Sequence, residues 1–378
     1  MERQPVRVLY VNGGTMDRGG ISSYMMNYFR HIDRNLIHID FVVHGDGGIY
    51  DDEIMKLKGN VFHVPTKKQS YFGNRNQIRK IILNGNYDII HSHMDGMNGK
   101  ILKWAKELGV KIRISHSHNT AYLTTNKIKL IYHEYMRKEI PKYATHLFAC
   151  SRQAGEWLYG GRKFQVIPNA IDTNKFFFNA GKRAELRSKL GLGDNYVIGH
   201  IGRFDINQKN QLFLLEVFAK LLKIKSDAQL ILIGDGLDRE LVEDKINELE
   251  LNKNVILLGE KDNVNDWLNV FDIFCFPSNF EGLGVVMIEA QANGLACVCS
   301  DKVPNEVNIS GNVKFLGLND GINDWVDNLL EDFGRDENAT KKLTISGYDI
   351  NAAANKLQHL YLEMKHRINT EKREEEIK

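Results

Sequence analysis

The sequence predicts an α/β protein made of two doubly wound, parallel-sheet domains. The chain has 378 residues, and single hydrophobic cores rarely grow beyond about 250–300 residues, so two cores are expected. Short runs rich in β-branched residues alternate with helical patterns, which is typical of parallel sheets covered by helices. The alternation pauses at VIPNAIDTNKF (166–176) and then restarts, which places the domain boundary between residues 176 and 177.

The first domain, residues 1–176, is expected to contain five strands separated by helices. Each strand is a short apolar run, and each helix repeats apolar residues three or four positions apart. In chain order we expect strand 6–11, helix 22–32, strand 38–44, helix 51–59, strand 87–93, helix 99–109, strand 111–118, helix 127–142 and strand 145–151.

The second domain, residues 177–349, repeats the same alternation. A last helix over about 350–378 is expected to pack back on the first domain, with its charged tail in solvent. The elements expected before it are strand 196–202, helix 209–224, strand 228–236, helix 237–250, strand 254–260, helix 263–270, strand 273–278, helix 285–294, strand 296–301 and a helix in INDWVDNLLEDF (322–333).

Composition excludes several classes of protein. The formal net charge is +2, from 50 basic and 48 acidic residues, so no overall field marks a nucleic-acid-binding protein. No run approaches the ~18–20 apolar residues that span a bilayer, so a cytoplasmic protein is expected. The cysteines lack metal-site spacing and lie in or beside apolar runs, which predicts buried thiols in a reducing compartment; they are Cys150, Cys275, Cys297 and Cys299.

Ligands of open parallel sheets bind where strands end and helices begin. At the first such place, NGGTMDRGG, Gly14 and Gly19 have P-loop spacing, but Gly20 and Ile21 stand where lysine and serine or threonine are needed. No GxGxxG occurs there, so ATP hydrolysis and hydride transfer lose support. A turn whose N–H groups approach a phosphate or a sugar remains, capped by one of the serines of the ISS run that follows; a plain βα turn is the alternative.

Two cations follow the first strand of the second domain. Arg203 and Lys209 leave the same loop, GRFDINQKN, and together they could neutralise a diphosphate without a metal. Two solvated surface cations are the alternative. Because no DxD pattern occurs anywhere in the chain, we expect a phosphate site that needs neither metal nor cofactor.

The stretch FPSNFEGLGVVMIEAQANG places two acids around a glycine turn. Gly282 and Gly284 let an anion approach the N-terminus of the helix that carries Glu289. Glu281 and Glu289 then flank this anion and accept hydrogen bonds from the hydroxyls of a ribose and a hexose. A capping acid and a solvated helix acid are the alternative. Glycoside hydrolysis, which also uses two carboxylates, fits poorly beside a helix end suited to phosphate.

Histidines occupy two further strand ends, in IIHSHMDG and ISHSHNT. His91 and His93 share one face of a strand, as do His116 and His118. A zinc site of four histidines can be imagined, but no HExxH motif supports it. Buried, hydrogen-bonded histidines are the favoured interpretation, with a functional hydrogen-bonding role for His118, at the tip of its strand, as the alternative.

The segment NKIKLIYHEYMRKEIPKY (126–143) interleaves basic and apolar residues. The favoured interpretation is a core-facing helix with a solvated basic face. The alternative is a face that rests on an anionic bilayer.

Together these motifs resemble the retaining nucleotide-sugar glycosyltransferases of family 4. The residues that carry the resemblance are Gly19-Gly20, VIPNAID (166–172), GRFDINQKN, LILIGDG (230–236) and above all FPSNFEGLGVVMIEAQANG. The resemblance implies the GT-B fold, with two Rossmann-like domains facing across a cleft. It is nearest to bacterial enzymes of capsular or exopolysaccharide synthesis, which elongate a lipid-linked sugar at the inner face of the membrane.

The resemblance also implies roles for single residues. Arg203 and Lys209 would hold the donor diphosphate, Glu289 the ribose and Glu281 the donor sugar, with His118 near the reacting centre. The other implied donor-binding residues are Gly19, Gly20, Gly234, Gly282, Leu283 and Gly284. The sequence departs from the family pattern at Asn119, Ala170 and Gly284.

The implied reaction is metal-independent transfer from a nucleotide sugar, a UDP-sugar above all, to a glycan or lipid-linked glycan, with retention of configuration by front-face attack. Closure of the domains would exclude water. Two other functions suit the same architecture: a nucleotide-sugar epimerase and a non-catalytic sugar-nucleotide-binding protein. The PNxID turn and the GLG helix start favour the transferase over the epimerase. The presence of both acids, Glu281 and Glu289, and of both cations argues against a non-catalytic protein.

Overall fold

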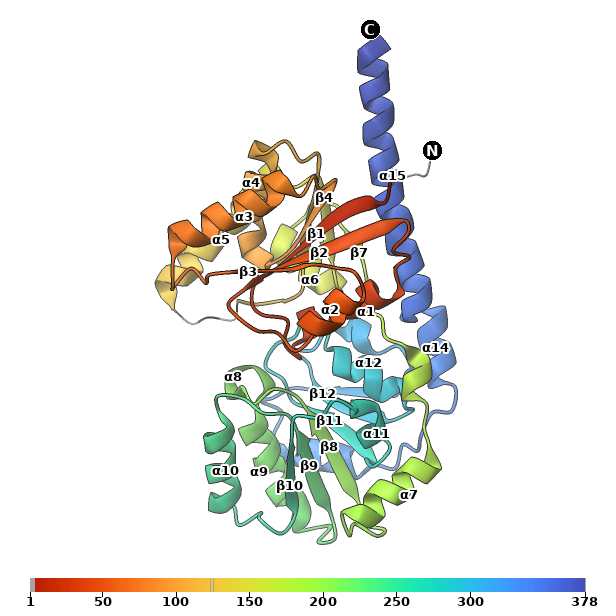
Figure 1. The fold of residues 1–378 in the computed structure, drawn as a ribbon. Coiled ribbons are helices and arrows are strands. Elements are labelled where there is room, and N and C mark those ends of the chain that lie inside the picture. The colour runs from red at the N-terminus through yellow and green to blue at the C-terminus, as the bar shows by residue number, and fades with distance from the viewer. Residues whose placement is uncertain (1–3, 123, 125, 378) are drawn as a thin grey trace. The chain divides into compact units, whose positions relative to one another are not determined.

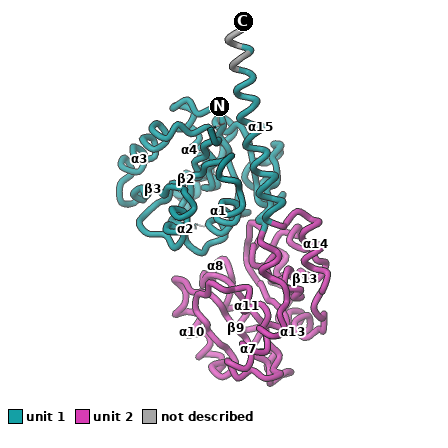
Figure 2. Tube along the Cα trace, turned by 45° about the vertical axis from the view of Figure 1, so that its right-hand side comes forward, with its two compact units in different colours: residues 1–170, 350–378 teal, residues 171–349 magenta. Residues whose placement is uncertain are grey.

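The computed structural model describes residues 4–122, 124 and 126–377, and the chain forms two compact units (Figures 1 and 2). Unit 1 comprises residues 1–170 and 350–378, and unit 2 comprises residues 171–349. The two ends of unit 2 are hydrogen-bonded to each other: Ile171 N–H donates to Tyr348 O at 3.0 Å, and Ile171 forms a parallel bridge with Asp349. The predicted boundary at residue 176 therefore falls inside unit 2, at the end of the 3-10 turn η2 (Thr173–Phe176).

Unit 1 is built on a seven-stranded parallel sheet with the order β3-β2-β1-β4-β5-β6-β7. Its strands are β1 (Val6–Asn12), β2 (Ile37–His44), β3 (Val61–Val64), β4 (Ile89–His93), β5 (Ile112–Ser117), β6 (His146–Ala149) and β7 (Gln165–Val166). Its helices are α1 (Gly20–His31), α2 (Asp51–Lys56), α3 (Tyr71–Asn84), the 3-10 turn η1 (Asp95–Met97), α4 (Asn98–Glu107), α5 (Lys127–Tyr143), α6 (Arg152–Tyr159) and α15 (Ile350–Ile377).

Helices cover both faces of this sheet, because side chains of a strand point alternately to its two faces. Along β1, Val8 and Tyr10 pack in a core that includes residues of α1, α2 and α15. Leu9 and Val11 pack in a second core with α3 and α4. A strand buried on both faces reads as a continuous apolar run, which is why the sequence identified β1.

The last helix, α15, completes the first of these cores. Its buried residues in that core are Ile350, Ala353, Ala354, Leu357, Tyr361 and Met364. The Tyr361 hydroxyl lies 3.1 Å from the Tyr10 hydroxyl and 2.7 Å from His91 Nδ1. The first half of α15 thus packs within unit 1, against strands from the beginning of the chain (Figure 2).

Unit 2 has a six-stranded parallel sheet with the order β10-β9-β8-β11-β12-β13. Its strands are β8 (Val197–Ile201), β9 (Gln229–Ile233), β10 (Val255–Gly259), β11 (Ile273–Phe276), β12 (Ala296–Ser300) and β13 (Val313–Leu316). Its other elements are α7 (Ala180–Lys189), α8 (Ile206–Lys209), α9 (Gln211–Leu222), α10 (Arg239–Glu248), α11 (Val264–Leu268), α12 (Val285–Ala292), η3 (Asn305–Val307), α13 (Ile322–Leu330) and α14 (Ala339–Ile345).

The predicted α/β class with two parallel-sheet domains is confirmed. Elements that the sequence did not reveal are short or have few buried residues: β3, α3, α6, β7, α7, β13 and α14. Among the described helices, none is long and apolar enough to cross a bilayer. The four cysteines are buried free thiols.

Candidate active site

Two loops of unit 2 meet at the carboxyl edge of its sheet. Lys209 follows β8, and Glu281 follows β11; these strands are neighbours, so the loops meet although 72 residues separate them. Lys209 Nζ donates a hydrogen bond to Glu281 Oε1 at 2.5 Å, and it lies 4.8 Å from the centroid of the Phe276 ring. The loops also join through Asn279 N–H, which donates to Gln208 O at 2.8 Å.

The position of Lys209 depends on a break in a predicted helix. The sequence predicts one helix over 209–224, but Asn210 has a left-handed φ of 58° and separates α8 from α9. The Asp205 side chain caps α8 by accepting a hydrogen bond from Gln208 N–H at 3.1 Å. Lys209 therefore ends a four-residue helix, from which its ammonium reaches Glu281.

The Lys209–Glu281 ion pair is largely withdrawn from water. The Lys209 side chain is 15% exposed and that of Glu281 is 7% exposed. Loss of one partner of a buried pair leaves an uncompensated charge, which is strongly destabilising. Arg203, the other predicted diphosphate ligand, lies in the same loop as Lys209 with an exposed side chain.

Glu289 lies on α12, which begins after Gly284, a glycine with φ of 82°. It is the fifth residue of this helix, so it lies in the second turn. Its side chain is half-buried and has no hydrogen bond or ion pair to the described residues. Burial raises the pKa of the Glu289 carboxyl to about 7. A desolvated carboxylate without a partner is typical of a ligand-binding position.

The structure explains some predicted donor-binding residues by packing alone. Gly234 has φ of 138°, and a Cβ atom there would lie 2.0 Å from Gly202 O, so the exits of β8 and β9 approach too closely for a side chain. The Leu283 side chain is buried, which leaves only its backbone to face a ligand.

In unit 1, Gly19 precedes α1, and its N–H donates to Asp17 Oδ1 at 2.8 Å. A Cβ atom on Gly20 would meet open space. The predicted serine cap is wrong, because α1 begins at Gly20.

The four histidines of unit 1 form a hydrogen-bonded ladder between β4 and β5. His91 Nε2 lies 3.0 Å from His116 Nδ1, and His93 Nδ1 lies 2.8 Å from His118 Nε2. The rings of His91 and His93 are tilted by 30° with centroids 4.2 Å apart, and those of His116 and His118 stack with centroids 4.3 Å apart. Nitrogens of His91, His93 and His116 lie within 4.8 Å of one another, but both ring nitrogens of His91 already have hydrogen-bond partners, Tyr361 and His116. The hydrogen-bonded interpretation therefore fits this ladder better than a zinc site.

A strained aspartate holds the turn that carries His118. Asp95 is half-buried, with a left-handed φ of 46° that is uncommon for residues other than glycine. Its Oδ1 accepts a hydrogen bond from His118 N–H at 2.8 Å, and its Oδ2 accepts one from Asn119 Nδ2 at 2.6 Å. The sequence singled out His118 but missed Asp95, whose importance depends on contacts more than twenty residues away along the chain.

Comparison with known proteins decides the family. A family model described as Glycosyltransferase Family 4 matches residues 18–175, and one described as Glycosyl transferases group 1 matches residues 195–332. EpsF of Bacillus subtilis strain 168, named as a glycosyltransferase, is 34% identical over 98% of this chain and 99% of its own.

The chain belongs to glycosyltransferase family 4.

Two further proteins extend the comparison of this family-4 glycosyltransferase. The UDP-Gal:alpha-D-GlcNAc-diphosphoundecaprenol alpha-1,3-galactosyltransferase of Escherichia coli is 30% identical, over 75% of this chain and 78% of that protein. The solved structure of Anabaena Alr3699/HepE in complex with UDP and glucose has a TM-score of 0.76 at 17% identity, over 94% of this chain and 99% of that chain. The likeness to the solved structure concerns the fold, and it confirms the predicted GT-B class.

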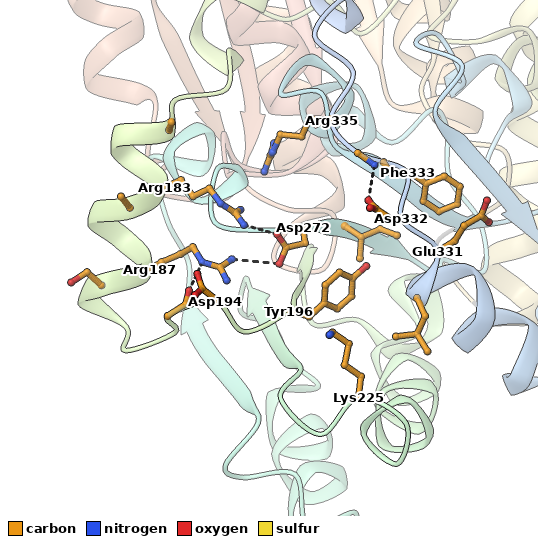
Figure 3. A pocket seen from close by; sticks show the side chains of 18 of the residues that line it. Arg183, Arg187, Asp194, Tyr196, Lys225, Asp272, Glu331, Asp332, Phe333 and Arg335 are labelled. Atoms are coloured by element: carbon orange, nitrogen blue, oxygen red, sulfur yellow. Dashed lines mark hydrogen bonds and ion pairs between the residues drawn. The ribbon is translucent and has the colours of Figure 1, made fainter.

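A pocket of about 1160 Å³ in unit 2 of the glycosyltransferase (Figure 3) has a lining that does not include Lys209, Glu281 or Glu289. It is lined by Tyr196, Asp272 and Ala296, at the amino ends of β8, β11 and β12, whereas Lys209 and Glu281 lie at the carboxyl edge. The guanidinium groups of Arg183 and Arg187 bind Asp272 and backbone carbonyl oxygens. Because these donors already have protein partners, we assign the pocket no part in catalysis.

Acid should destabilise unit 1 of the glycosyltransferase more than unit 2. Burial lowers the pKa of all four ladder histidines, that of His118 to about 3. A histidine whose pKa falls on folding stabilises the folded state fully above its unfolded pKa of about 6.5, and this contribution is lost as the pH falls. Between pH 7 and 5.5 each such histidine lowers the free energy of unfolding by about 1 kcal/mol. The four together should lower the free energy of unfolding of unit 1 by about 4 kcal/mol.

Tryptophan fluorescence can measure the two units separately, because Trp104 and Trp157 lie in unit 1 and Trp267 and Trp325 in unit 2. Urea unfolding of the W267F/W325F protein reports unit 1, and that of the W104F/W157F protein reports unit 2. Equal losses in both units on moving from pH 7 to 5.5 would contradict the prediction.

The hydrogen bond between Asp95 and Asn119 should survive if the carboxylate and the amide change places, but not if both positions carry a carboxylate. Asn119→Asp places a second carboxylate within 2.6 Å of Asp95 Oδ2, and two such like charges destabilise the turn. We expect this variant to lose at least tenfold in sugar transfer together with stability. The double variant D95N/N119D restores one amide and one carboxylate and should recover both. Equal defects in the single and double variants would show that the pairing does not matter.

Proposed function

We propose that the protein is a retaining hexosyltransferase that transfers a sugar from a UDP-sugar to a lipid-linked sugar acceptor in the synthesis of capsular or exopolysaccharide. The observation that carries this proposal is the Lys209–Glu281 pair, largely withdrawn from water at the carboxyl edge of the sheet of unit 2. The helix α12 that follows Glu281 carries Glu289, an acid that has no partner among the described residues. The name of the E. coli relative, which transfers galactose from its UDP-sugar to a sugar on diphosphoundecaprenol, supports the donor and acceptor classes.

In this proposal the acceptor hydroxyl attacks the anomeric carbon on the face from which the nucleoside diphosphate leaves. The bond between the anomeric carbon and the phosphate oxygen breaks as the new glycosidic bond forms, and the hydroxyl proton passes to the leaving phosphate oxygen. Arg203 and Lys209 stabilise the charge that develops on the diphosphate. Glu281 accepts hydrogen bonds from the donor sugar and Glu289 from the ribose, so neither carboxylate acts as a nucleophile.

Because two cations take the place of a metal in this proposal, excess EDTA should leave transfer unchanged. Complete loss of transfer in EDTA, restored by Mg²⁺ or Mn²⁺, would contradict metal independence.

A panel of UDP-, GDP- and ADP-sugars tests the proposed function. The protein should bind one UDP-sugar and hydrolyse it slowly in the absence of acceptor, with the released sugar initially in the anomeric configuration of the donor. Conversion of the donor to an epimer without release of nucleotide would instead support an epimerase. Binding without turnover in the presence of lipid-linked acceptors would support a non-catalytic protein.

A surface of unit 1 suits contact with a membrane. The outward stripe of α5 contains Ile128 and Ile131, which are 80% and 72% exposed, with Tyr132 and Tyr135 beside them. Another side of α5 contains the buried Ile140 and packs on α4, where a Cβ atom on Gly99 would lie 2.4 Å from Met136 O. The expected core-facing side is therefore present, beside an exposed apolar stripe that was not expected. Residues 65–143 carry 15 lysine and arginine residues against 5 acids, a net charge of +10 in a chain of net charge +2. Exposed apolar side chains on a basic surface are typical of reversible docking to anionic lipid.

Vesicle co-sedimentation tests this docking. The wild type should pellet with vesicles containing phosphatidylglycerol and not with neutral vesicles, and salt should weaken the binding. Lys129→Glu combined with Lys138→Glu should weaken binding at least tenfold, because each basic residue near such a surface contributes roughly 1 kcal/mol. Replacing Ile128 and Ile131 by serine should weaken binding without changing the charge.

The matched control is Lys220→Glu with Lys223→Glu, which makes the same charge change at exposed positions of unit 2. Arg137 is unsuitable for the test, since its guanidinium binds Glu134 and the Trp157 carbonyl oxygen and so helps to anchor α5. Equal pelleting of the α5 variants and the wild type would contradict membrane docking.

A further inference from the structure

Unit 1 contains a lysine whose charge no acid balances. Lys67, between β3 and α3, is half-buried and forms no ion pair with the described residues. Burial and the nearby Lys100 lower the pKa of Lys67 to about 8. Lysines are rarely withdrawn from water without a partner, because desolvation of the ammonium is costly.

Lys100, in the first turn of α4, is held in place without being neutralised. Its ammonium donates to the hydroxyl of Tyr132 on α5 at 2.8 Å and to the hydroxyl of Tyr71 on α3. It also lies 4.3 Å from the centroid of the Tyr71 ring. These partners fix the ammonium between three helices but carry no negative charge.

The acids of residues 65–143 do not balance either lysine. Each of the five acids between residues 65 and 143 already has another partner. Asp88 pairs with Lys365, Asp95 with His118 N–H and Asn119, Glu107 with Arg79, Glu134 with Arg137, and Glu139 with Lys142. His133 on α5 adds to the group: Lys67 and Lys129 contribute to the lowering of the His133 pKa, after burial.

The backbone adds further positive potential here. Lys67 follows β3 and Lys100 follows β4, so both lie at the carboxyl edge of the sheet, where α3 and α4 begin. The N-terminus of a helix carries partial positive charge and usually attracts acids. The first turns of α3, α4 and α5 contain none. Cations at such positions reduce stability, and an anionic ligand would relieve that repulsion.

We propose that Lys67, Lys100 and His133 form a site for the diphosphate of an amphipathic acceptor, with its hydrocarbon chain against the exposed apolar residues of α3 and α5. Those residues include Phe72, which is 69% exposed, together with Ile128 and Ile131. This inference rests on the proposed function in that it takes the ligand to be the acceptor. A free phosphate and a lipid headgroup share the charge of this ligand, and the experiment separates these sources.

Isothermal titration of the full chain with farnesyl diphosphate, inorganic pyrophosphate and farnesol tests the site. Farnesyl diphosphate should bind most tightly, since it offers both charge and apolar chain. The K67M/K100M variant should bind it at least tenfold more weakly, whereas Lys103→Met, an exposed lysine one turn further along α4, should bind as the wild type does. Lys67→Met should also raise the melting temperature, because it removes an unbalanced half-buried charge.

Three results would overturn the proposal. Equal affinity of K67M/K100M and wild type for farnesyl diphosphate would exclude the site. If the K67M/K100M variant lost as much affinity for phosphatidylglycerol vesicles as for farnesyl diphosphate, the two lysines would be part of a general membrane-binding surface and not of a diphosphate site. Loss of UDP-sugar binding in the K67M/K100M variant would show that Lys67 and Lys100 belong to the donor-binding site. If instead no nucleotide sugar binds the wild type while farnesyl diphosphate does, the proposed function fails and the anion site stands.

Discussion

Removal of either site cation in unit 2 is expected to reduce sugar transfer by at least a hundredfold, the usual effect of deleting one group that stabilises developing charge. For Lys209 the loss of activity should be accompanied by a loss of stability of about 3–5 kcal/mol, because Lys209→Met leaves the buried Glu281 without its 2.5 Å partner. Arg203→Met should lose activity without that destabilisation, since the Arg203 side chain is exposed.

The controls separate loss of chemistry from loss of fold. The double variant K209M/E281Q removes both charges and should regain most of the stability while it remains inactive. Lys253→Met, at an exposed position of unit 2, should resemble the wild type in both measurements. Steady-state transfer rates and urea unfolding at pH 8 provide the data. A wild-type rate in Arg203→Met, or in K209M/E281Q, would remove the cations from the mechanism.

Glu289→Gln is expected to weaken donor binding by roughly 10- to 150-fold, the equivalent of one hydrogen bond to a charged group, and yet to stabilise the protein. Burial raises the pKa of Glu289 to about 7 in the folded protein, above its usual value near 4.3. The penalty for the folded state is therefore absent at low pH, grows between these two values and is largest above pH 7. Since the side chain is only half-buried, we expect the gain at pH 8 to be on the order of 1–3 kcal/mol.

Urea unfolding at pH 5 and pH 8, with titration of the UDP-sugar by calorimetry, checks both parts. Glu337→Gln, an exposed acid of the same unit, is the matched control and should change neither stability nor affinity. A variant at position 289 that is destabilised at pH 8 would show that the carboxylate has a structural partner. Wild-type donor affinity in that variant would contradict the ribose assignment.

The sequence predicted the central strands of the two sheets better than the strands at their edges. Central strands such as β1 and β11 are buried on both faces, so they appear as continuous apolar runs. β3 and β13 lie at sheet edges, are four residues long and include exposed residues, so their patterns are weak. The break at Asn210 was also missed, because asparagine is compatible with both a helix and a left-handed turn.

The site was predicted in part. Arg203, Lys209, Glu281 and Glu289 were chosen because they follow strands, and the parallel topology does place these loops at one edge. The salt bridge between Lys209 and Glu281 was not foreseen, because it depends on the adjacency of β8 and β11 and on the short helix α8. For α5, periodicity predicted a single apolar stripe but could not show whether protein or solvent covers it.

The packing of α15 affects how the chain folds as the ribosome makes it. Tyr361 and its neighbours fill a core whose strands begin at Val6, and the whole of unit 2 is synthesised between them. At about 5–20 residues per second, the first strands wait on the order of ten seconds or more for their last helix. Unit 2 is contiguous and can complete its core first, so we expect the usual N-terminal-first order of domain folding to be reversed. During that wait the apolar face of β1 and α1 is exposed, which makes nascent chains that stop before residue 350 candidates for chaperone binding.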